Sequence, residues 1–287
     1  MRLVDICSVA FSLLALTKKV SVTPIVGGQV VASTKKCFST RFQFLAARKY
    51  SYMVSLQECK QPFSAQNLSE CQHFCGGALL SESWIVTAAH CLWRKDLSLI
   101  SAVIGHENLA IADQNISLHA VERFEFIYYQ PNIIQNDIAL VRLRKPYESE
   151  FDAKSGGYGR LPPPGLNNTT GASCQIIGYG ATQYAGVLQS NLFEGEVSVI
   201  AKKECSEILG RILAPPHDDT TICALGKNQD TCQGDSGGPL ICKLKDSFSI
   251  VGIVSHGLTC GITGIPSIYT AIMPYLEWIN LVINEKN

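Results

Sequence analysis

Three short stretches of the chain carry residues that could act together in nucleophilic catalysis. VTAAHC places His90 at the end of a β-rich run, QNDIALVRL places Asp137 before another, and GDSGGP places Ser236 in a glycine-rich turn. A serine hydroxyl is a weak nucleophile unless a base lies within hydrogen-bond reach, and that base needs an acceptor that fixes its tautomer. The three residue types therefore match the nucleophile, base and orienting carboxylate of an acyl-transfer mechanism.

Each of these residues also has a simpler explanation. Taken singly, His90 fits a packed histidine, Asp137 a solvated strand cap, and Ser236 an ordinary turn serine. Six defined residues around Ser236 rarely coincide with both other stretches, and this coincidence favours the catalytic interpretation. Two further acids, Asp230 and Asp235, lie near Ser236 in the sequence, and neither is obviously placed to activate it.

Short β-rich runs separated by turn residues must position these side chains. WIVTAA, SAVIG, IALVRL, CQIIGYG, EVSVI and SIVGIVSHG are typical of strands in an all-β barrel or sandwich. Residues 155–171 are rich in glycine, proline and asparagine and predict a crossover between two β units. Pro274 predicts the start of a terminal helix. The apolar face of that helix comprises Tyr275, Trp278, Ile279 and Val282.

The N-terminal residues have the pattern of a secretory signal peptide. A short basic start precedes the apolar run Ile6–Leu16, which is too short to span a bilayer. The alternative is a buried strand or helix of the mature fold. The 12 cysteines indicate disulfides formed in an oxidising compartment, and with Cys7 in the signal the number left is odd. Sequons agree with a secreted glycoprotein; they lie at Asn67, Asn115, Asn167 and Asn168.

The overall composition bounds the class of protein. Lys plus Arg and Asp plus Glu both total 24, so the net charge predicts neither nucleic acid nor an acidic membrane as a partner. A hydrophobic content of 46% is enough for a sizeable core. After the signal, no stretch of the sequence is long and apolar enough to span a membrane.

Together the motifs resemble the chymotrypsin-like serine protease family, and its trypsin branch in particular. IVGG, CGGALL, VTAAHC, NDIALVRL, GYG, GDSGGPL and EWI occur in the family's order between Ile25 and about Trp278. The motifs around His90 and Ser236 are highly specific, whereas GYG is weak. The resemblance implies two six-stranded antiparallel Greek-key β-barrels with an active-site cleft between them and a C-terminal helix. It implies a signal peptide and short propeptide in 1–24, a first barrel in 25–154, the crossover in 155–171, and a second barrel with the helix in 172–287.

The resemblance also implies a role for each site residue. Ser236 would attack the scissile carbonyl, His90 would shuttle the proton, and Asp137 would orient His90. The backbone N–H groups of Gly234 and Ser236 would form the oxyanion hole.

Activation and substrate binding follow from the same resemblance. Asp235 would pair with a new amino terminus at Ile25 once a propeptide is removed, so that the protein is made as a zymogen. Asp230 would form the floor of the primary specificity pocket and favour Arg or Lys. The other substrate-binding residues would be Thr231, Ser255, His256, Gly257 and Ser267, with Ser255 also supporting the buried aspartate.

The resemblance pairs most of the cysteines as disulfides. The pairs are Cys75–Cys91, Cys174–Cys242, Cys205–Cys223 and Cys232–Cys260. Pairing Cys59 with Cys71 would close a short hairpin. The rival interpretation is a metal site of Cys59, Cys71, His73 and Cys75, but secretion favours disulfides, and Cys37 is left over.

Several positions depart from the family. Pro24 precedes IVGG, where an activation cleavage usually follows Lys or Arg. Residues 32–45 form an insert that could be a surface loop, a polyanion-binding patch or a splicing artefact. His106 stands where calcium-binding trypsins carry a glutamate, so no calcium is inferred. His256 replaces a tryptophan beside the substrate strand, which either alters the preference at more distant subsites or is a matter of packing. Ser267 replaces a glycine, which predicts a narrower pocket.

The sequence therefore predicts a secreted serine endopeptidase that cleaves after Arg or Lys through an acyl-enzyme. We expect a monomer that acts on polypeptides, is bound by protein inhibitors and needs no cofactor or metal. The alternative is a catalytically silent, trypsin-shaped binding protein or an unprocessed zymogen.

Overall fold

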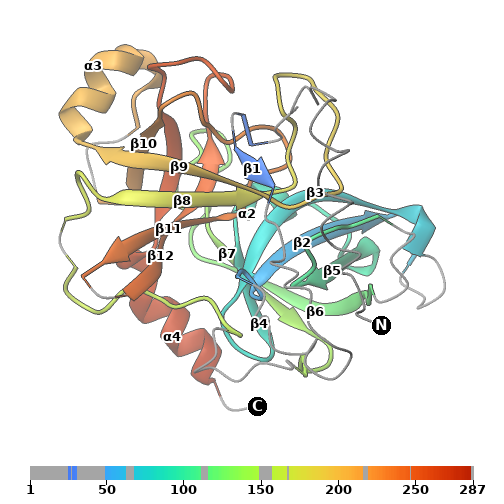
Figure 1. The fold of residues 1–287 in the computed structure, drawn as a ribbon. Coiled ribbons are helices and arrows are strands. Elements are labelled where there is room, and N and C mark those ends of the chain that lie inside the picture. Colours follow the sequence, from blue (N-terminus) through green and yellow to red (C-terminus); the bar gives the residue numbers. More distant parts are fainter. Residues whose placement is uncertain are drawn as a thin grey trace, which may run out of the picture.

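The computed structural model describes residues 25–26, 28–30, 49–62, 68–110, 116–148, 157–166, 168–215, 219–245 and 247–285 (Figure 1). The predicted signal peptide, the Pro24 junction, the insert with Cys37, and the sequons at Asn67, Asn115 and Asn167 lie outside these residues. Those interpretations stay predictions.

The first half of the chain closes into an antiparallel barrel. Its strands are β2 (Met53–Cys59), β3 (Cys71–Leu79), β4 (Trp84–Thr87), β5 (Ile100–Ile104), β6 (His119–Phe126) and β7 (Ala139–Leu143). The ring order is β2-β3-β4-β7-β6-β5. Five of these strands, β2, β3, β4, β5 and β7, consist mostly of buried residues. In β4, β5 and β7 this burial fits a β-branched and apolar composition.

The second half forms another antiparallel barrel. Its strands are β8 (Ser173–Gly178), β9 (Phe193–Ile200), β10 (Thr221–Gly226), β11 (Pro239–Leu244), β12 (Ser247–His256) and β13 (Ser267–Ala271). The sheet order β9-β10-β13-β12-β11-β8 closes through the β8–β9 pairing. Residues of β9 alternate between buried and more exposed, as expected for a barrel wall with one face in the core. The prediction of two six-stranded barrels is confirmed.

A short N-terminal strand crosses from one half to the other. β1 (Gln29–Val30) lies early in the chain but pairs with β9 of the second barrel, with Gln29 opposite Glu194. The residues that follow the predicted activation junction therefore belong to the second sheet in space, although the expected first domain includes them in sequence. This strand delivers Ile25 to the second barrel.

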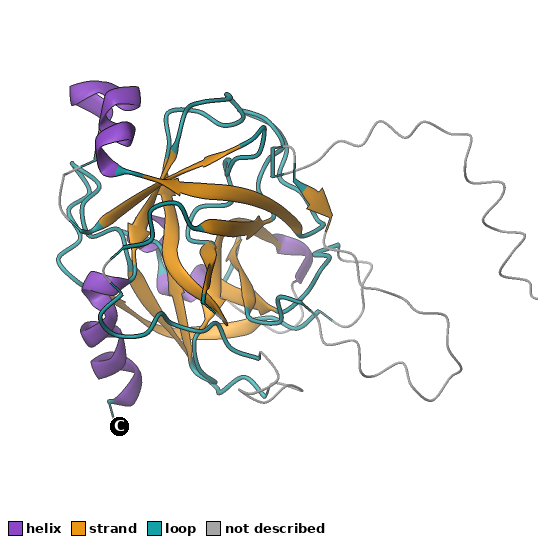
Figure 2. Cartoon of the chain, turned by 60° about the vertical axis from the view of Figure 1, so that its left-hand side comes forward, coloured by secondary structure: helices purple, strands orange, loops and turns teal. Residues whose placement is uncertain are grey.

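In the part of the chain that the structure describes, helices are few and short (Figure 2). They are α2 (Ala89–Leu92), α3 (Lys202–Leu213) and α4 (Leu276–Asn284), with 3-10 turns η1 (Leu68–Glu70), η2 (Leu97–Leu99) and η3 (Met273–Tyr275). The terminal helix begins where Pro274 predicts, and its Tyr275 and Ile279 are buried against the first barrel's core. No sequence pattern noted above predicts α3. Among the described residues, no helix is long and apolar enough to cross a membrane.

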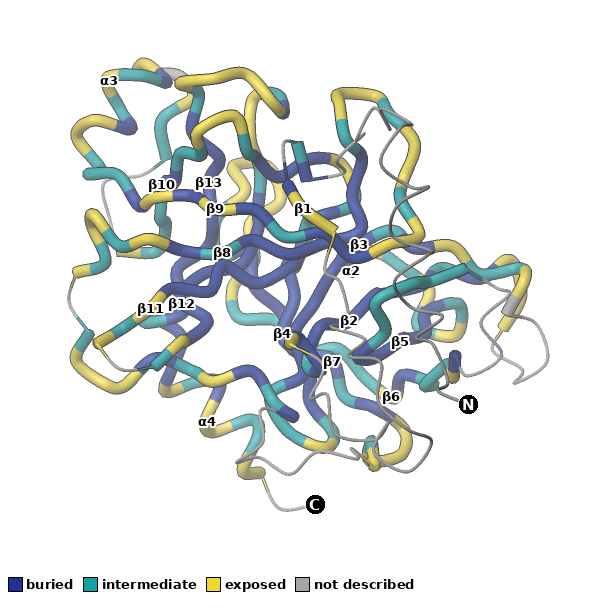
Figure 3. The backbone as a smooth tube through the Cα atoms, in the orientation of Figure 1, coloured by how far each residue is buried: buried dark blue, intermediate teal, exposed yellow. Residues whose placement is uncertain are grey.

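One hydrophobic core joins the two barrels at their contact. Its largest cluster is built on the first barrel and also contains Ile177, Ile241, Ile253 and Ile272 from the second half. Buried backbone accordingly runs without interruption through the centre of the molecule (Figure 3). A shared core of this kind holds the facing edges of the two barrels in a fixed relation.

Candidate active site

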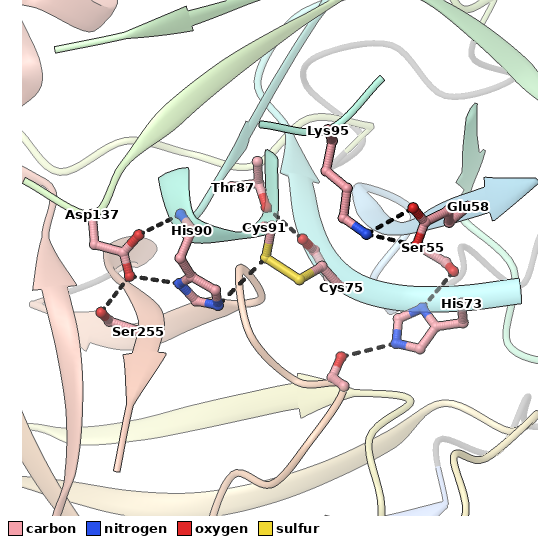
Figure 4. The surroundings of a disulfide bond; sticks show 12 residues. Ser55, Glu58, His73, Cys75, Thr87, His90, Cys91, Lys95, Asp137 and Ser255 are labelled. Atoms are coloured by element: carbon pink, nitrogen blue, oxygen red, sulfur yellow. Dashed lines mark hydrogen bonds and ion pairs between the residues drawn. A yellow bond between two sulfur atoms is a disulfide. The ribbon is translucent and has the colours of Figure 1, made fainter. Parts of the chain in front are cut away.

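His90 lies in the first turn after β4 and faces Asp137. Its backbone N–H donates to Asp137 Oδ1 at 2.8 Å, and its Nδ1 lies 2.8 Å from Asp137 Oδ2 (Figure 4). Thr87 ends β4, Ala88 is still extended, and α2 then turns the histidine back. The Cys75–Cys91 disulfide ties this turn to β3.

Asp137 is 1% exposed and accepts three hydrogen bonds. The third comes from Ser255, whose hydroxyl donates to Oδ2 at 2.5 Å. Burial by itself raises the pKa of Asp137, but the hydrogen bonds and charge of His90 and the Ser255 hydroxyl outweigh it, so the pKa lies below its ordinary value. The carboxylate is therefore ionised at neutral pH. It accepts a hydrogen bond from His90 Nδ1–H, so that the other ring nitrogen, Nε2, is the one that can act as an acceptor.

Ser236 lies in a turn between two glycines that take positive φ, Gly234 at 96° and Gly237 at 81°. Gly237 must be glycine on a second ground, because a Cβ there would lie 2.2 Å from the hydroxyl of Thr87. The serine carbonyl accepts from the Gly76 N–H at 2.7 Å, which fixes the turn against the first barrel.

The hydroxyl of Ser236 is not hydrogen-bonded to His90 in the part of the chain that the structure describes. His90 Nε2 instead lies 3.7 Å from the Cys91 sulfur. Ser236 does line a pocket of about 250 Å³ together with Ser255, His256, Gly257 and Ser267. The structure thus joins His90, Asp137 and Ser255 by hydrogen bonds and places Ser236 at the adjacent pocket. A larger hollow of about 420 Å³, lined in part by Lys202 and Met273, includes neither Ser236 nor the four residues named with it in the smaller pocket.

Asp235 is fully buried behind Ser236. Its carboxylate accepts from the backbone N–H groups of Gly180 and Cys232, both at 2.9 Å. A Cβ on Gly178 would lie 1.9 Å from Asp235 Oδ1, so this packing requires glycine. Burial raises the pKa of Asp235 to about 7, although the two N–H donors lower it in part. Ile25, its predicted partner in activation, is fully buried in the second barrel's core cluster.

His73 is a site residue that the sequence interpretation used only as a possible metal ligand. Its Nδ1 lies 2.7 Å from the Ser55 hydroxyl and its Nε2 lies 2.8 Å from the Gly234 carbonyl. Gln57 donates to the same hydroxyl, which leaves the Ser55 proton for His73 Nδ1, so that Nε2–H donates to Gly234. Burial lowers the pKa of His73 to about 4, and the bond to the Gly234 carbonyl only partly offsets this. The neutral ring therefore links β3 to the Ser236 turn by a hydrogen bond. No local motif in the sequence could have revealed this role.

Asp230 lies behind the pocket wall rather than open to it. Its Oδ1 accepts from the Ser267 hydroxyl at 2.6 Å and the Thr231 N–H at 2.8 Å, and its Oδ2 accepts from the Gly261 N–H at 3.1 Å. The Thr231 hydroxyl in turn donates to Ser267 at 3.2 Å. Thr231 and Ser267 line the 250 Å³ pocket and Asp230 does not. Burial raises the pKa of Asp230 in spite of these three donors.

The described residues contain five disulfides, and they are the pairs named from the sequence. They are Cys59–Cys71, Cys75–Cys91, Cys174–Cys242, Cys205–Cys223 and Cys232–Cys260. The rival metal site is therefore wrong, because its three cysteines are oxidised and have no thiolate to offer. The same holds for the cluster of Cys75, His90 and Cys91, whose ligand atoms lie within 4.8 Å of one another.

Asn168 is the one predicted glycosylation site within the described residues. It is exposed on the segment that leads into β8, and its side-chain oxygen accepts from the Thr170 N–H at 2.8 Å. An exposed sequon is accessible to glycosylation, and the modification itself stays a prediction.

Comparison with known proteins places the chain in a family. The sequence model of the Trypsin family matches residues 44–279. Two chicken (Gallus gallus) proteins, Trypsin I-P1 and Trypsin I-P38, are each 34% identical to this chain over 228 residues. Each alignment covers 77% of this chain and 84% of the relative. With the two-barrel fold, these matches show that the chain belongs to the trypsin branch of the chymotrypsin-like serine proteases.

Proposed function

We propose that the protein is a secreted serine endopeptidase that cleaves peptide bonds after Arg or Lys. The observation that carries the chemistry is the pair of hydrogen bonds from His90 to the buried, ionised Asp137, beside a pocket lined by Ser236. This pair fixes the tautomer that leaves His90 Nε2 ready to accept a proton.

In the proposed mechanism, His90 Nε2 takes the proton from the Ser236 hydroxyl as its oxygen attacks the scissile carbonyl. The Asp137 carboxylate stabilises the imidazolium that forms. The N–H groups of Gly234 and Ser236 stabilise the oxyanion. His90 then protonates the leaving amine, and water attacks the acyl-enzyme to regenerate Ser236. The distance between Ser236 and His90 closes when a substrate fills the pocket, since catalytic hydrogen bonds tighten in such complexes.

Specificity for a basic residue rests on the buried charge of Asp230. A carboxylate without a cation is costly in a low-dielectric site, so a basic side chain entering the pocket gains the interaction that the site lacks. Thr231 and Ser267 line the pocket, and Ser267 binds Asp230. Their hydroxyls either bridge the basic side chain to the Asp230 carboxylate or move aside when it binds. Gly257 also lines the pocket and has no side chain to obstruct it.

Secretion and the remaining expectations are supported indirectly. Five disulfides are typical of an oxidising compartment, which agrees with a signal peptide in 1–24. We propose a monomer that acts on polypeptides, is bound by protein protease inhibitors, and uses no nucleic acid, membrane or cofactor.

The test of the mechanism is the Ser236→Ala variant. Wild-type mature protein should turn over a peptide substrate and be labelled by an organophosphonate, and the variant should do neither while melting at an unchanged temperature. Turnover that persists in the variant would contradict the acyl-enzyme. A wild-type protein that is cleaved before Ile25 yet is never labelled would instead favour the catalytically silent alternative.

A further inference from the structure

The chain of hydrogen bonds on Asp137 extends one residue beyond Ser255. The Ser255 hydroxyl oxygen lies 2.5 Å from Asp137 Oδ2 and 3.0 Å from His256 Nδ1. Ser255 is buried, whereas His256 is half-buried and lines the pocket beside Ser236. The imidazole of His256 is therefore linked to the Asp137 carboxylate, which also binds His90, by way of the Ser255 hydroxyl.

The direction of each bond follows from the donors available. Asp137 is ionised and can only accept, so the single proton of the Ser255 hydroxyl goes to Asp137. The remaining contact then requires a donor on the other side, which is the Nδ1–H of His256. Burial and the His90 charge lower the pKa of His256, while the Asp137 charge raises it in part, so the ring is neutral at neutral pH. The neutral ring carries its proton on Nδ1 and leaves Nε2 bare.

A backbone irregularity turns His256 toward Ser255. Neighbouring residues of a regular strand point to opposite faces, and Ser255 and His256 are adjacent on β12. The pairing with β13 shifts register between Val254 and His256, from Val254 opposite Tyr269 to His256 opposite Ile268. A bulge of this kind re-aims a side chain. It brings the two adjacent side chains within hydrogen-bond distance.

We propose that His256 is a positioning residue for the reaction: its Nδ1–H holds the Ser255 hydroxyl in the orientation that donates to Asp137. Without that donor the Ser255 hydroxyl loses a bond that opposes its rotation, and the carboxylate that orients His90 loses part of its support. The proposal rests on the proposed function, because it assigns a role in the same reaction. The tautomer that it requires can nevertheless be measured without any turnover.

The first experiment is nitrogen NMR of ¹⁵N-histidine-labelled mature protein carrying Ser236→Ala. We expect the neutral His256 ring to carry its proton on Nδ1, and to lose this preference when Ser255→Ala is added. The signals are assigned by their loss in the His256→Asn variant. A neutral His256 with its proton on Nε2 while Ser255 is present would overturn the proposal, whether or not the protein is an active enzyme.

The second experiment compares two amide substitutions that differ only in reach. In His256→Asn the amide occupies the place of Nδ1 and can still donate to Ser255, whereas in His256→Gln it reaches the place of Nε2. We expect kcat to be about fivefold lower in the Gln variant than in the Asn variant, as for the loss of one hydrogen bond. Because both variants remove the same ring from the pocket, any change in KM should be the same in both.

The same pair in a Ser255→Ala background is the control. With the hydroxyl gone, the Asn and Gln variants should have the same kcat, because the residue through which His256 acts is absent. A fivefold difference that persists without Ser255 would overturn the proposal, and so would equal kcat values in the presence of Ser255. If His256 only lined the pocket, its substitution would change KM, and removal of the Ser255 hydroxyl would leave the His256 tautomer unaffected.

Discussion

At the scale of single residues, the Ser267 hydroxyl should limit how strongly Asp230 attracts a basic substrate side chain. It donates to Asp230 at 2.6 Å and lies on the pocket side of the carboxylate. A charge-assisted hydrogen bond of this kind already compensates part of the negative charge before any substrate binds. It also occupies space, since a Cβ on Gly257 would lie 3.3 Å from the same hydroxyl oxygen.

Ser267→Gly should therefore raise kcat/KM for cleavage after Arg or Lys, by on the order of tenfold for a hydrogen bond to a charged group. A peptide library that varies the residue before the scissile bond measures this in wild type, Ser267→Gly and Asp230→Ser. The Asp230→Ser control should lose the preference for basic residues. Preference of the wild type for aromatic or small residues would contradict the assigned specificity.

At the scale of elements, β3 supports the turn that carries Ser236 through one imidazole and one backbone N–H. His73 on β3 is bonded to Ser55 on β2 and to the Gly234 carbonyl, which is 161 residues away in the sequence. Gly76 on the same strand donates to the Ser236 carbonyl. The first barrel thus binds the turn at two carbonyls, those of Gly234 and Ser236. The geometry of the turn therefore depends on how that barrel is packed.

His73→Gln should retain more activity than His73→Asn, because only the longer amide reaches the Gly234 carbonyl. We expect kcat about two- to tenfold lower in the Asn variant than in the Gln variant, as for one neutral hydrogen bond. Steady-state kinetics normalised to the concentration of labelled active sites gives this ratio. Equal kcat values in the two variants would show that the Gly234 bond does not organise the turn.

At the scale of the whole molecule, a free amino terminus at Ile25 would change the charge balance of the second barrel. Asp235 is fully buried, its pKa is raised to about 7, and its bonded partners are the N–H groups of Gly180 and Cys232. An ammonium released at Ile25 can pair with this carboxylate, which then becomes stable as an anion. In the proposed activation, the new ammonium group would supply a cation for the buried Asp235 carboxylate.

We expect a protein with a specific protease site directly before Ile25 to gain peptidase activity when it is cut there. Cleavage should also change the pH dependence of stability. In the uncleaved chain the folded state binds a proton at Asp235 that the unfolded state has released, so the free energy of unfolding falls as pH rises from about 4 to about 7. This loss has an upper bound on the order of 4 kcal/mol.

Pairing with the Ile25 ammonium lowers the pKa of Asp235 and removes that loss, so the cleaved form should gain stability relative to the uncleaved form between pH 5 and pH 8. Urea unfolding of both forms at the two pH values measures the difference. The depressed pKa of His73 acts in the opposite direction but equally in both forms. Identical pH dependence, or full activity in protein that retains VSVTP before Ile25, would refute the mechanism of activation.

Much of the fold is decided by local patterns that can be read in the chain. Short β-rich runs with Gly, Pro and Asn between them predict an all-β barrel or sandwich, and Pro274 with its apolar face predicts the closing helix, since these features depend on neighbouring residues. The division into two barrels is implied by the resemblance of the motifs to the family. The three motifs around His90, Asp137 and Ser236 likewise identify which residues to inspect. Each of these signals lies within one strand, turn or helix.

The tertiary structure decided what these residues contact. The bond of Ser255 to Asp137, which the family resemblance implied but no local pattern contains, spans 118 residues. The bond of His73 to Gly234, which was not predicted, spans 161. Such pairs are brought together by barrel closure and the shared core. The bulge that aims His256 at Ser255, and the Ser267 hydroxyl that covers Asp230, depend on strand register. Register is set by pairing between distant segments, and for that reason no single stretch of the sequence contains it.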